Sequence, residues 1–196
     1  MRNSSKDKIP HDHRVLVIAS NPGFKPVDRQ ALMDKLRTAS LRIINIRVAS
    51  RHVEIDLYID DYKEIEKIKA LGFNINELVN IGEETKNASD AHDHFVRLFN
   101  AERFWEAHEV LEDVWRRNRD EGIRGGLIIL AAAFVKIQEN NLEAFKRLMI
   151  RARELIAKNE IPYINRERLL RKIDNALLIT KPFKIEKEDL ESIQKT

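Results

Sequence analysis

Hydrophobic and polar residues follow two different periods in the two parts of this chain. Between residues 14 and 82, short apolar runs with the two-residue alternation of β-strands are interleaved with segments whose apolar residues recur every three or four positions, as in helices. After residue 88 only the helical period remains. The pattern therefore predicts an α+β protein with a sheet in its N-terminal part and an all-α helical bundle after it.

Four strands and two helices are expected in the N-terminal part. In chain order they are a strand at 14–20, a helix at 27–39, strands at 41–50 and 52–60, a helix at 61–72 and a strand at 73–81. The second and third strands are joined only by Ser50-Arg51, which predicts an antiparallel hairpin. The order β-α-β-β-α-β is the ferredoxin-like pattern, in which two helices cover one face of a four-stranded sheet.

The alternation within the hairpin predicts one buried and one solvent-exposed sheet face. We expect the buried face to carry Ile44, Ile46, Val48, Val53, Ile55, Leu57 and Ile59, and the exposed face to carry Asn45, Arg47, Glu54, Asp56, Tyr58 and Asp60. A sheet that binds RNA presents exposed aromatic and positively charged residues, whereas this face has mixed charge. It is better suited to docking the helical part, a second subunit or a small ligand.

Four or five helices are expected in the C-terminal part, at roughly 89–100, 102–118, 122–140, 142–158 and 165–180. Their short connections favour antiparallel neighbours in a compact bundle. The segment 126–137 is apolar nearly all round and should lie at the centre, where Gly125 and Gly126 would allow a neighbouring helix to approach closely. The predicted organisation is a disordered leader at 1–13, the ferredoxin-like domain at 14–82, a linker at 83–88, the bundle at 89–181 and a tail at 182–196.

Composition and charge narrow the classes of function. With no cysteine, the chain has neither disulfides nor thiolate metal sites nor a cysteine nucleophile. The longest apolar run, Leu127 to Val135, is far shorter than the roughly 20 residues of a membrane span, and residues 1–13 lack the apolar region of a signal peptide, so a cytoplasmic protein is expected. The net charge of +3 makes nucleic-acid binding, through the basic segment 146–172, a weaker alternative.

The segment 104–115, FWEAHEVLEDVW, mixes aromatic and titratable side chains in one predicted helix. At about 100° per residue, Phe104, Ala107, Leu111, Val114 and Trp115 share the packed face. His108 lies at its edge, Glu112 about 40° further round, and Glu109 about 100° from His108 on the more solvated side. Because polar groups taken partly out of water need partners, we expect a binding patch composed of Trp105, His108, Glu109, Glu112 and Trp115.

Three roles for this patch remain open. His108 and Glu112 could form a structural pair, with Arg97, Arg103 or Arg124 balancing the carboxylate. They could bind a small ligand or a partner. They could also be two ligands of a zinc, manganese or iron ion in a metal-dependent hydrolase with Glu109 as general base, although the second histidine of the HExxH motif is replaced here by Glu112. His92 and His94 point to different helix faces, so only one of them could join such a site.

The same residues resemble a known family. His108, Glu109, Leu111, Glu112 and Trp115 match a His-Glu-x-Leu-Glu-x-x-Trp (HExLExxW) motif, and Gly126, Leu127 and Ile128 begin a Gly-Leu-Ile-rich helix. On these residues the chain resembles domain-of-unknown-function family 309 over about residues 89–160. Where many members have Gln and His in the second helix, this chain has Ile129 and Lys136, which leaves fewer polar groups for a metal site. The resemblance implies a helical fold and marks the patch; it implies no activity.

These observations predict a small-ligand-binding or protein-interaction module built on the bundle. A metal-dependent hydrolase and a nucleic-acid-binding protein are the alternatives, so whether the chain is an enzyme stays open. No cofactor is indicated by the residues. A homo-oligomer could form through the open sheet face or through the bundle.

Overall fold

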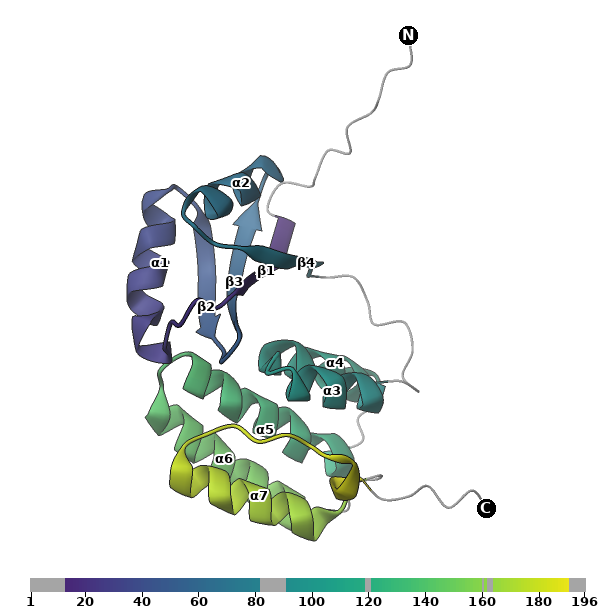
Figure 1. The fold of residues 1–196 in the computed structure, drawn as a ribbon. Coiled ribbons are helices and arrows are strands. Elements are labelled where there is room, and N and C mark those ends of the chain that lie inside the picture. The colour runs from purple at the N-terminus through teal and green to yellow at the C-terminus, as the bar shows by residue number, and fades with distance from the viewer. Residues whose placement is uncertain (1–12, 82–90, 119–120, 160, 162–163, 191–196) are drawn as a thin grey trace. The chain divides into compact units, whose positions relative to one another are not determined.

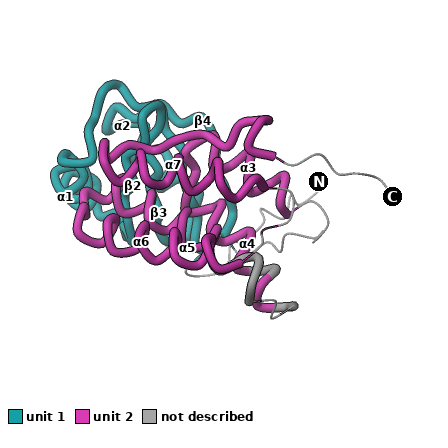
Figure 2. The backbone as a smooth tube through the Cα atoms, turned by 90° about the horizontal axis from the view of Figure 1, so that it is seen from below, with its two compact units in different colours: residues 1–84 teal, residues 85–196 magenta. Residues whose placement is uncertain are grey.

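The computed structural model describes residues 13–81, 91–118, 121–159, 161 and 164–190. The chain divides into two compact units, residues 1–84 and 85–196 (Figure 2). The predicted linker, nearly all of the predicted leader and residues 191–196 of the predicted tail lie outside the described residues. Within the described ranges no helix is long and apolar enough to cross a membrane.

The first unit has the predicted α+β order of elements (Figure 1). In chain order these are β1 His13–Ser20, a 3-10 turn at Pro26–Asp28, α1 Arg29–Thr38, β2 Arg42–Val48, β3 His52–Ile59, α2 Lys63–Ala70 and β4 Ile75–Asn80. The strands lie in the order β2-β3-β1-β4, and every neighbouring pair is antiparallel. This is the strand order of the ferredoxin-like pattern, so the predicted fold class is confirmed.

One face of this sheet packs against both helices. Alternate residues of β1 and β3, from Val15 to Ala19 and from Val53 to Ile59, form a single core with apolar residues of α1 and α2. Leu36 on α1 and Ile68 on α2 are fully buried in it. Because successive side chains of a strand point to opposite faces, both helices must cover the same side of the sheet.

The prediction that Ile44 faces this core is wrong. Ile43 lies opposite Leu57 and Asn45 lies opposite Asp56, so Ile44 is an extra residue in a β-bulge. The bulge shifts the alternation by one residue, with the result that Ile43 is buried and Ile44 is 37% exposed. Beyond the bulge, Ile46 and Val48 are buried as predicted.

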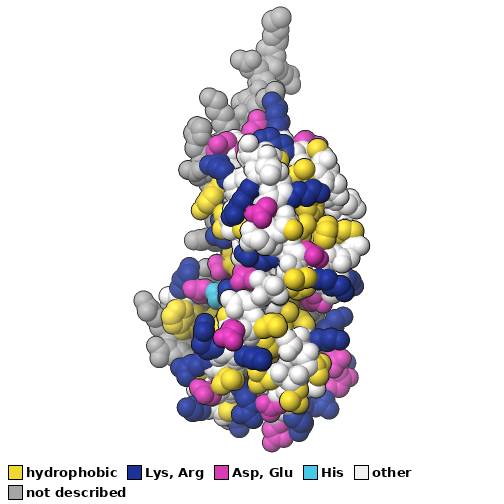
Figure 3. All heavy atoms as spheres, turned by 90° about the vertical axis from the view of Figure 1, so that its left-hand side faces the viewer, with side chains coloured by type: hydrophobic (Ala, Val, Ile, Leu, Met, Phe, Trp, Pro, Cys, Tyr) yellow, Lys and Arg dark blue, Asp and Glu magenta, His cyan; other side chains and the backbone are white. Residues whose placement is uncertain are grey.

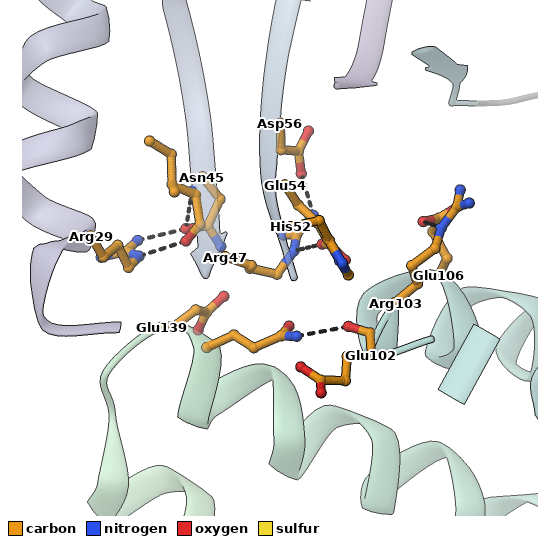
Figure 4. Close-up of polar contacts among 12 residues, drawn as sticks. Arg29, Asn45, Arg47, His52, Glu54, Asp56, Glu102, Arg103, Glu106 and Glu139 are labelled. Atoms are coloured by element: carbon orange, nitrogen blue, oxygen red, sulfur yellow. Dashed lines mark hydrogen bonds and ion pairs between the residues drawn. The ribbon is translucent and has the colours of Figure 1, made fainter. Parts of the chain in front are cut away.

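The prediction of a solvent-exposed second sheet face is wrong for Arg47, Glu54 and Asp56, although it is right for Asp60. Arg47, Glu54 and Asp56 are each at most 2% exposed, whereas Asn45 is partly buried and Tyr58 is exposed. The buried charges compensate one another, because Arg47 Nε donates to Glu54 Oε2 over 2.5 Å and Arg47 Nη2 lies 3.4 Å from Asp56 Oδ2 (Figure 4). Buried ions are tolerated when they are paired and hydrogen-bonded in this way.

Two further side chains complete this network. Arg14 Nε and Nη2 donate to the two oxygens of Asp56 over 2.9 and 2.8 Å, and His52 Nε2 lies 3.5 Å from Glu54 Oε1. Burial alone would raise the pKa of Glu54, but the Arg47 guanidinium and the hydrogen bonds from His52 and Arg47 outweigh it, so the pKa lies below the ordinary value. Glu54 is therefore held as a carboxylate.

The second unit is a bundle of helices, as predicted. Its helices are α3 Ala91–Asn100, α4 Phe104–Asn118, α5 Glu121–Gln138, α6 Leu142–Lys158 and α7 Arg166–Ile179. α5 packs against both α4 and α6, which confirms its central place (Figure 1). The predicted close approach is confirmed at Gly126, where a Cβ atom would stand 2.6 Å from Ile156 Cγ1.

The prediction of a tail from residue 182 is wrong for residues 182–190. Ile185 is buried in the core of the bundle, and the Phe183 ring lies 5.8 Å from that of Phe99 and 5.3 Å from that of Phe134. Asn100 Nδ2 donates to Ile185 O over 2.7 Å, and Ile185 N donates to Asn100 Oδ1 over 2.8 Å. The segment folds back because burying Phe183 and Ile185 removes apolar surface from water.

Candidate functional site

α4 carries the candidate site on the edge of its buried face. Phe104, Ala107 and Leu111 are buried in the bundle core, and Trp105 packs partly buried against it. The next side chains round the helix are less covered: His108 is 23% exposed, Glu112 24% and Glu109 39%. The predicted partial burial of His108 and Glu112 is what the structure shows, and both groups remain open to solvent.

The structure brings His108 into contact with two carboxylates. Its Nδ1 atom lies 3.2 Å from Glu109 Oε1 and 3.4 Å from Glu112 Oε2. Position round the helix suggested that Glu109 would lie away from the pair, but its side chain is long enough to reach back to the neighbouring imidazole. One ring nitrogen therefore sits beside one oxygen of each carboxylate.

An arginine that the sequence analysis did not single out balances Glu112. Arg116 Nη2 donates to Glu112 Oε1 over 2.7 Å, from the position four residues further along α4. Of the arginines expected there, Arg103 instead binds both oxygens of Glu106, over 2.5 and 2.6 Å, and Arg124 lies outside the described side chains. The i, i+4 spacing of Glu112 and Arg116 was the signal that could have identified this pair.

The remaining aromatic member of the patch, Trp115, is partly buried on the same helix. Val114, expected beside it on the packed face, lies outside the described side chains. A helix repeats its faces every 3.6 residues, so Trp115 stands two turns beyond His108 on nearly the same side of α4. The patch is thus an elongated strip along one helix.

Three potential metal ligands are close together in the patch. One donor atom from each of His108, Glu109 and Glu112 lies within 4.8 Å of the others. Imidazole nitrogen and carboxylate oxygen are suitable ligands for zinc, manganese and iron. Three ligands leave coordination positions for water or substrate, as in catalytic rather than structural sites.

Neither histidine of α3 belongs to this group of donors among the residues that the structure describes. Burial lowers the pKa of His92, against an opposing effect of Asp93. Burial also lowers the pKa of His94, together with the positive charges of Arg97 and Arg103. Both imidazoles are consequently held toward the neutral form.

Several basic residues of α6 and α7 are paired with acidic side chains. On the face drawn in Figure 3, basic and acidic side chains are interspersed. Within the basic segment 146–172, Arg153 Nε donates to Asp174 Oδ1 over 2.5 Å, and Lys172 binds Glu186 and Asp189. These two cations, Arg153 and Lys172, are therefore offset by carboxylates rather than left for a phosphate.

Comparison with known proteins places the candidate site inside a recognised family segment. No curated protein and no solved structure matches the chain at a significant level. The family described as domain of unknown function (DUF309) matches residues 92–148, which include all five residues of the patch. The C-terminal half of the chain thus carries the DUF309 similarity that its HExLExxW motif predicted, across the segment running from α3 into α6.

Proposed function

We propose that this protein is a ligand-binding module and that the strip on α4 formed by Trp105, His108, Glu109, Glu112 and Trp115 is its binding site. The observation that carries the proposal is the convergence of one imidazole nitrogen and two carboxylate oxygens within 4.8 Å, at side chains that are covered but not closed off from solvent. Groups held together in this way are arranged for a ligand before it arrives, which reduces the entropy cost of binding.

Charge indicates which ligand the strip favours. Among the side chains that the structure describes here, the carboxylates of Glu109 and Glu112 and the guanidinium of Arg116 sum to −1 (−2 + 1) before the state of His108 is counted. The site therefore favours a cation. A divalent transition-metal ion is the simplest ligand that uses both the imidazole nitrogen and the carboxylate oxygens.

A second candidate function is metal-dependent hydrolysis. The supporting observation is the position of Glu109, which is more exposed than Glu112 and still lies 3.2 Å from His108 Nδ1. A carboxylate beside a metal-bound water can take its proton, provided that it is not itself a ligand. In this function Glu109 would be the general base, and His108 and Glu112 alone would hold the ion.

Calorimetric titration of the untagged protein with Zn²⁺ and with Mn²⁺ tests the binding proposal. We expect one saturable site, weakened at least tenfold by His108→Ala and by Glu112→Gln. Glu154→Gln is the matched control, because Glu154 pairs with Arg151 on the surface of α6 as Glu112 pairs with Arg116 on α4. Absence of saturable binding by both ions, or equal weakening by the control, would contradict the proposal.

Glu109→Gln separates the two functions. If Glu109 is a ligand, this variant loses metal affinity. If Glu109 is a general base, the Glu109→Gln variant still binds the metal but no longer hydrolyses an activated ester such as p-nitrophenyl acetate. No metal-dependent hydrolysis by the wild-type protein would exclude activity toward such esters and leave binding as the function.

A further inference from the structure

A pocket lies in the bundle, lined by none of the residues of the α4 strip. It has a volume of about 280 Å³ and lies between α7 and the segment that follows it. α7 contributes Arg168, Arg171, Lys172 and Asn175 to the lining. Phe183 and Asp189 line the pocket from residues 182–190, which fold back after α7 and are called the returning segment here. The α7 residues are spaced i, i+3, i+4 and i+7, so they share one face of the helix.

The returning segment is fixed in place, so the pocket has a defined wall. Ile185 is buried and makes two hydrogen bonds with the side chain of Asn100 on α3. Lys172 Nζ donates to Lys184 O over 2.9 Å, and Asn165 N donates to Asp189 O over 2.7 Å. The pocket is therefore bounded by chain held to both α3 and α7.

The charge of the lining is positive. Arg168, Arg171 and Lys172 contribute +3 and Asp189 contributes −1, which sums to +2. Lys172 is already bound to Asp189 and Glu186. Although partial burial by itself lowers the pKa of Lys172, these two carboxylates outweigh it and raise the pKa above its ordinary value. Lys172 thus fixes the wall and stays charged.

The side chains of Arg168 and Arg171 differ from that of Lys172 in their exposure and in their contacts. Both are exposed, and the side chain of neither forms a hydrogen bond or ion pair with another residue in the part of the chain that the structure describes. A guanidinium group presents several N–H donors in a planar fork that matches the oxygens of a phosphate. Two such groups one helical turn apart can hold one dianion between them.

The opposite wall supplies an apolar surface. Phe183 is partly buried, since its ring packs against Phe99 and Phe134, and it also lines the pocket. A ligand that reaches from the arginines toward Phe183 must therefore be anionic at one end and flat and apolar at the other.

We propose that this pocket binds a small phosphate monoester bearing a flat apolar group, with the phosphate between Arg168 and Arg171 and the apolar group against Phe183. Phosphate is favoured over carboxylate because its two negative charges match the two guanidinium groups of Arg168 and Arg171, while Lys172 is offset by Asp189 and Glu186. This site shares no residue with the α4 strip, so it does not depend on the function proposed there.

Titration of the full chain with phenyl phosphate, inorganic phosphate and phenol tests this assignment. We expect phenyl phosphate to bind with a stoichiometry of one, inorganic phosphate at least tenfold more weakly, and phenol more weakly still. Arg168→Gln and Arg171→Gln should each weaken phenyl phosphate at least tenfold. Arg147→Gln, which removes an exposed arginine from α6, should leave its affinity within twofold of the wild type.

Several outcomes would overturn the assignment. They are the absence of saturable phenyl phosphate binding, an equal affinity for inorganic phosphate, and a loss in Arg147→Gln as large as in Arg171→Gln. Tighter binding of single-stranded RNA than of phenyl phosphate, with strong salt dependence, would identify an extended basic surface instead.

The variant His108→Ala tests whether the pocket and the α4 strip are separate sites. Unchanged phenyl phosphate binding in this variant would show that they are, whereas a loss as large as in Arg171→Gln would contradict the separate pocket.

Discussion

Gly126 of α5 lies directly against Ile156 of α6, so closely that the side chain of any other residue at position 126 would overlap it. An added Cβ atom would stand 2.6 Å from Ile156 Cγ1 and 3.4 Å from Ile156 N. Ile156 is fully buried, so its side chain has little room to move away. The glycine therefore sets the separation of the two helices at the centre of the bundle.

Gly126→Ala should destabilise the bundle despite the better helix propensity of alanine. Overpacking costs about 1–3 kcal/mol, against a gain of up to about 1 kcal/mol from propensity. We expect a net loss of about 1 kcal/mol in the free energy of unfolding. Urea unfolding followed by tryptophan fluorescence is a direct measurement, because Trp105 and Trp115, the two tryptophans of the chain, both lie in the second unit.

A double-mutant cycle tests whether the destabilisation by Gly126→Ala comes from contact with Ile156. Ile156→Ala alone should cost about 2–5 kcal/mol through the cavity that it leaves. In that background the added methyl group of Gly126→Ala has space, so the second substitution should become neutral or stabilising. Equal effects of Gly126→Ala in both backgrounds would contradict the steric explanation.

Arg116→Ala should increase the affinity of the α4 strip for Zn²⁺ or Mn²⁺. Arg116 holds one oxygen of Glu112 over 2.7 Å, and a metal ion must compete with this ion pair and with its positive charge. Removing the exposed Arg116 side chain should make the free energy of metal binding more favourable by up to about 1 kcal/mol, which corresponds to a several-fold increase in affinity. Arg151→Ala, in the comparable Arg151–Glu154 pair on α6, should leave metal affinity unchanged in the same titration.

The stability of the first unit should depend on Glu54 at acid pH. Its lowered pKa means that the folded protein keeps Glu54 ionised at pH values where the unfolded chain already takes up a proton. The stabilisation is complete above about pH 4.5, the ordinary value, and is lost as the pH falls through the lower folded-state pKa. The protection factors of the β1 and β3 amides, that is, their exchange rates relative to the intrinsic rate at the same pH, should fall over this range.

Glu54→Gln should flatten this dependence, because the group that titrates is gone. The variant should also be less stable at pH 7, since the buried Arg47 loses the nearer of its two ionised partners, Glu54 and Asp56. Glu66→Gln, on the surface of α2, is the control and should retain the wild-type pH profile. A Glu54→Gln profile that overlays the wild type would refute the role of this carboxylate.

Asn100→Ala should release the segment at residues 182–190 from α3. The substitution removes the partners of both the N–H and the C=O group of Ile185, which is expected to cost about 2 kcal/mol or more. Urea unfolding followed by tryptophan fluorescence measures the loss in the free energy of unfolding. The control is Asn175→Ala, at an exposed position of α7, which should change this free energy by less than about 0.5 kcal/mol. Similar effects of the two substitutions would argue against a fixed segment.

Much of the fold could be predicted because periodicity reports directly on burial. The alternation in β3 identified Val53, Ile55, Leu57 and Ile59 as buried, and the apolar circumference of α5 identified the central helix. The bulge at Ile44 could not be predicted, because an extra residue in a strand is defined by its pairing with β3. The burial of Glu54 and Asp56 was missed for a related reason, since their charges are compensated across strands, by Arg47 for Glu54 and by Arg14 for Asp56.

The candidate site was predicted in part. Helical spacing placed His108 and Glu112 on one side of α4, and their distance of 3.4 Å agrees with it. The approach of Glu109 depends on its side-chain torsions, which residue spacing does not determine. The segment at residues 182–190 carried a readable signal, the alternation of Phe183 and Ile185 with Lys184 and Glu186, but this signal was too short to separate from a polar tail.

The hydrogen bonds between Asn100 and Ile185 join residues 85 positions apart, and this separation determines when the bundle can be completed during protein synthesis. A ribosome adds about 5–20 residues per second, so α3 emerges roughly 4–17 seconds before the partner that its last residue requires. The four strands of the first unit all precede α3 and need nothing that follows them to pair. The ferredoxin-like sheet can therefore assemble while the bundle is still being translated, and the bundle closes last.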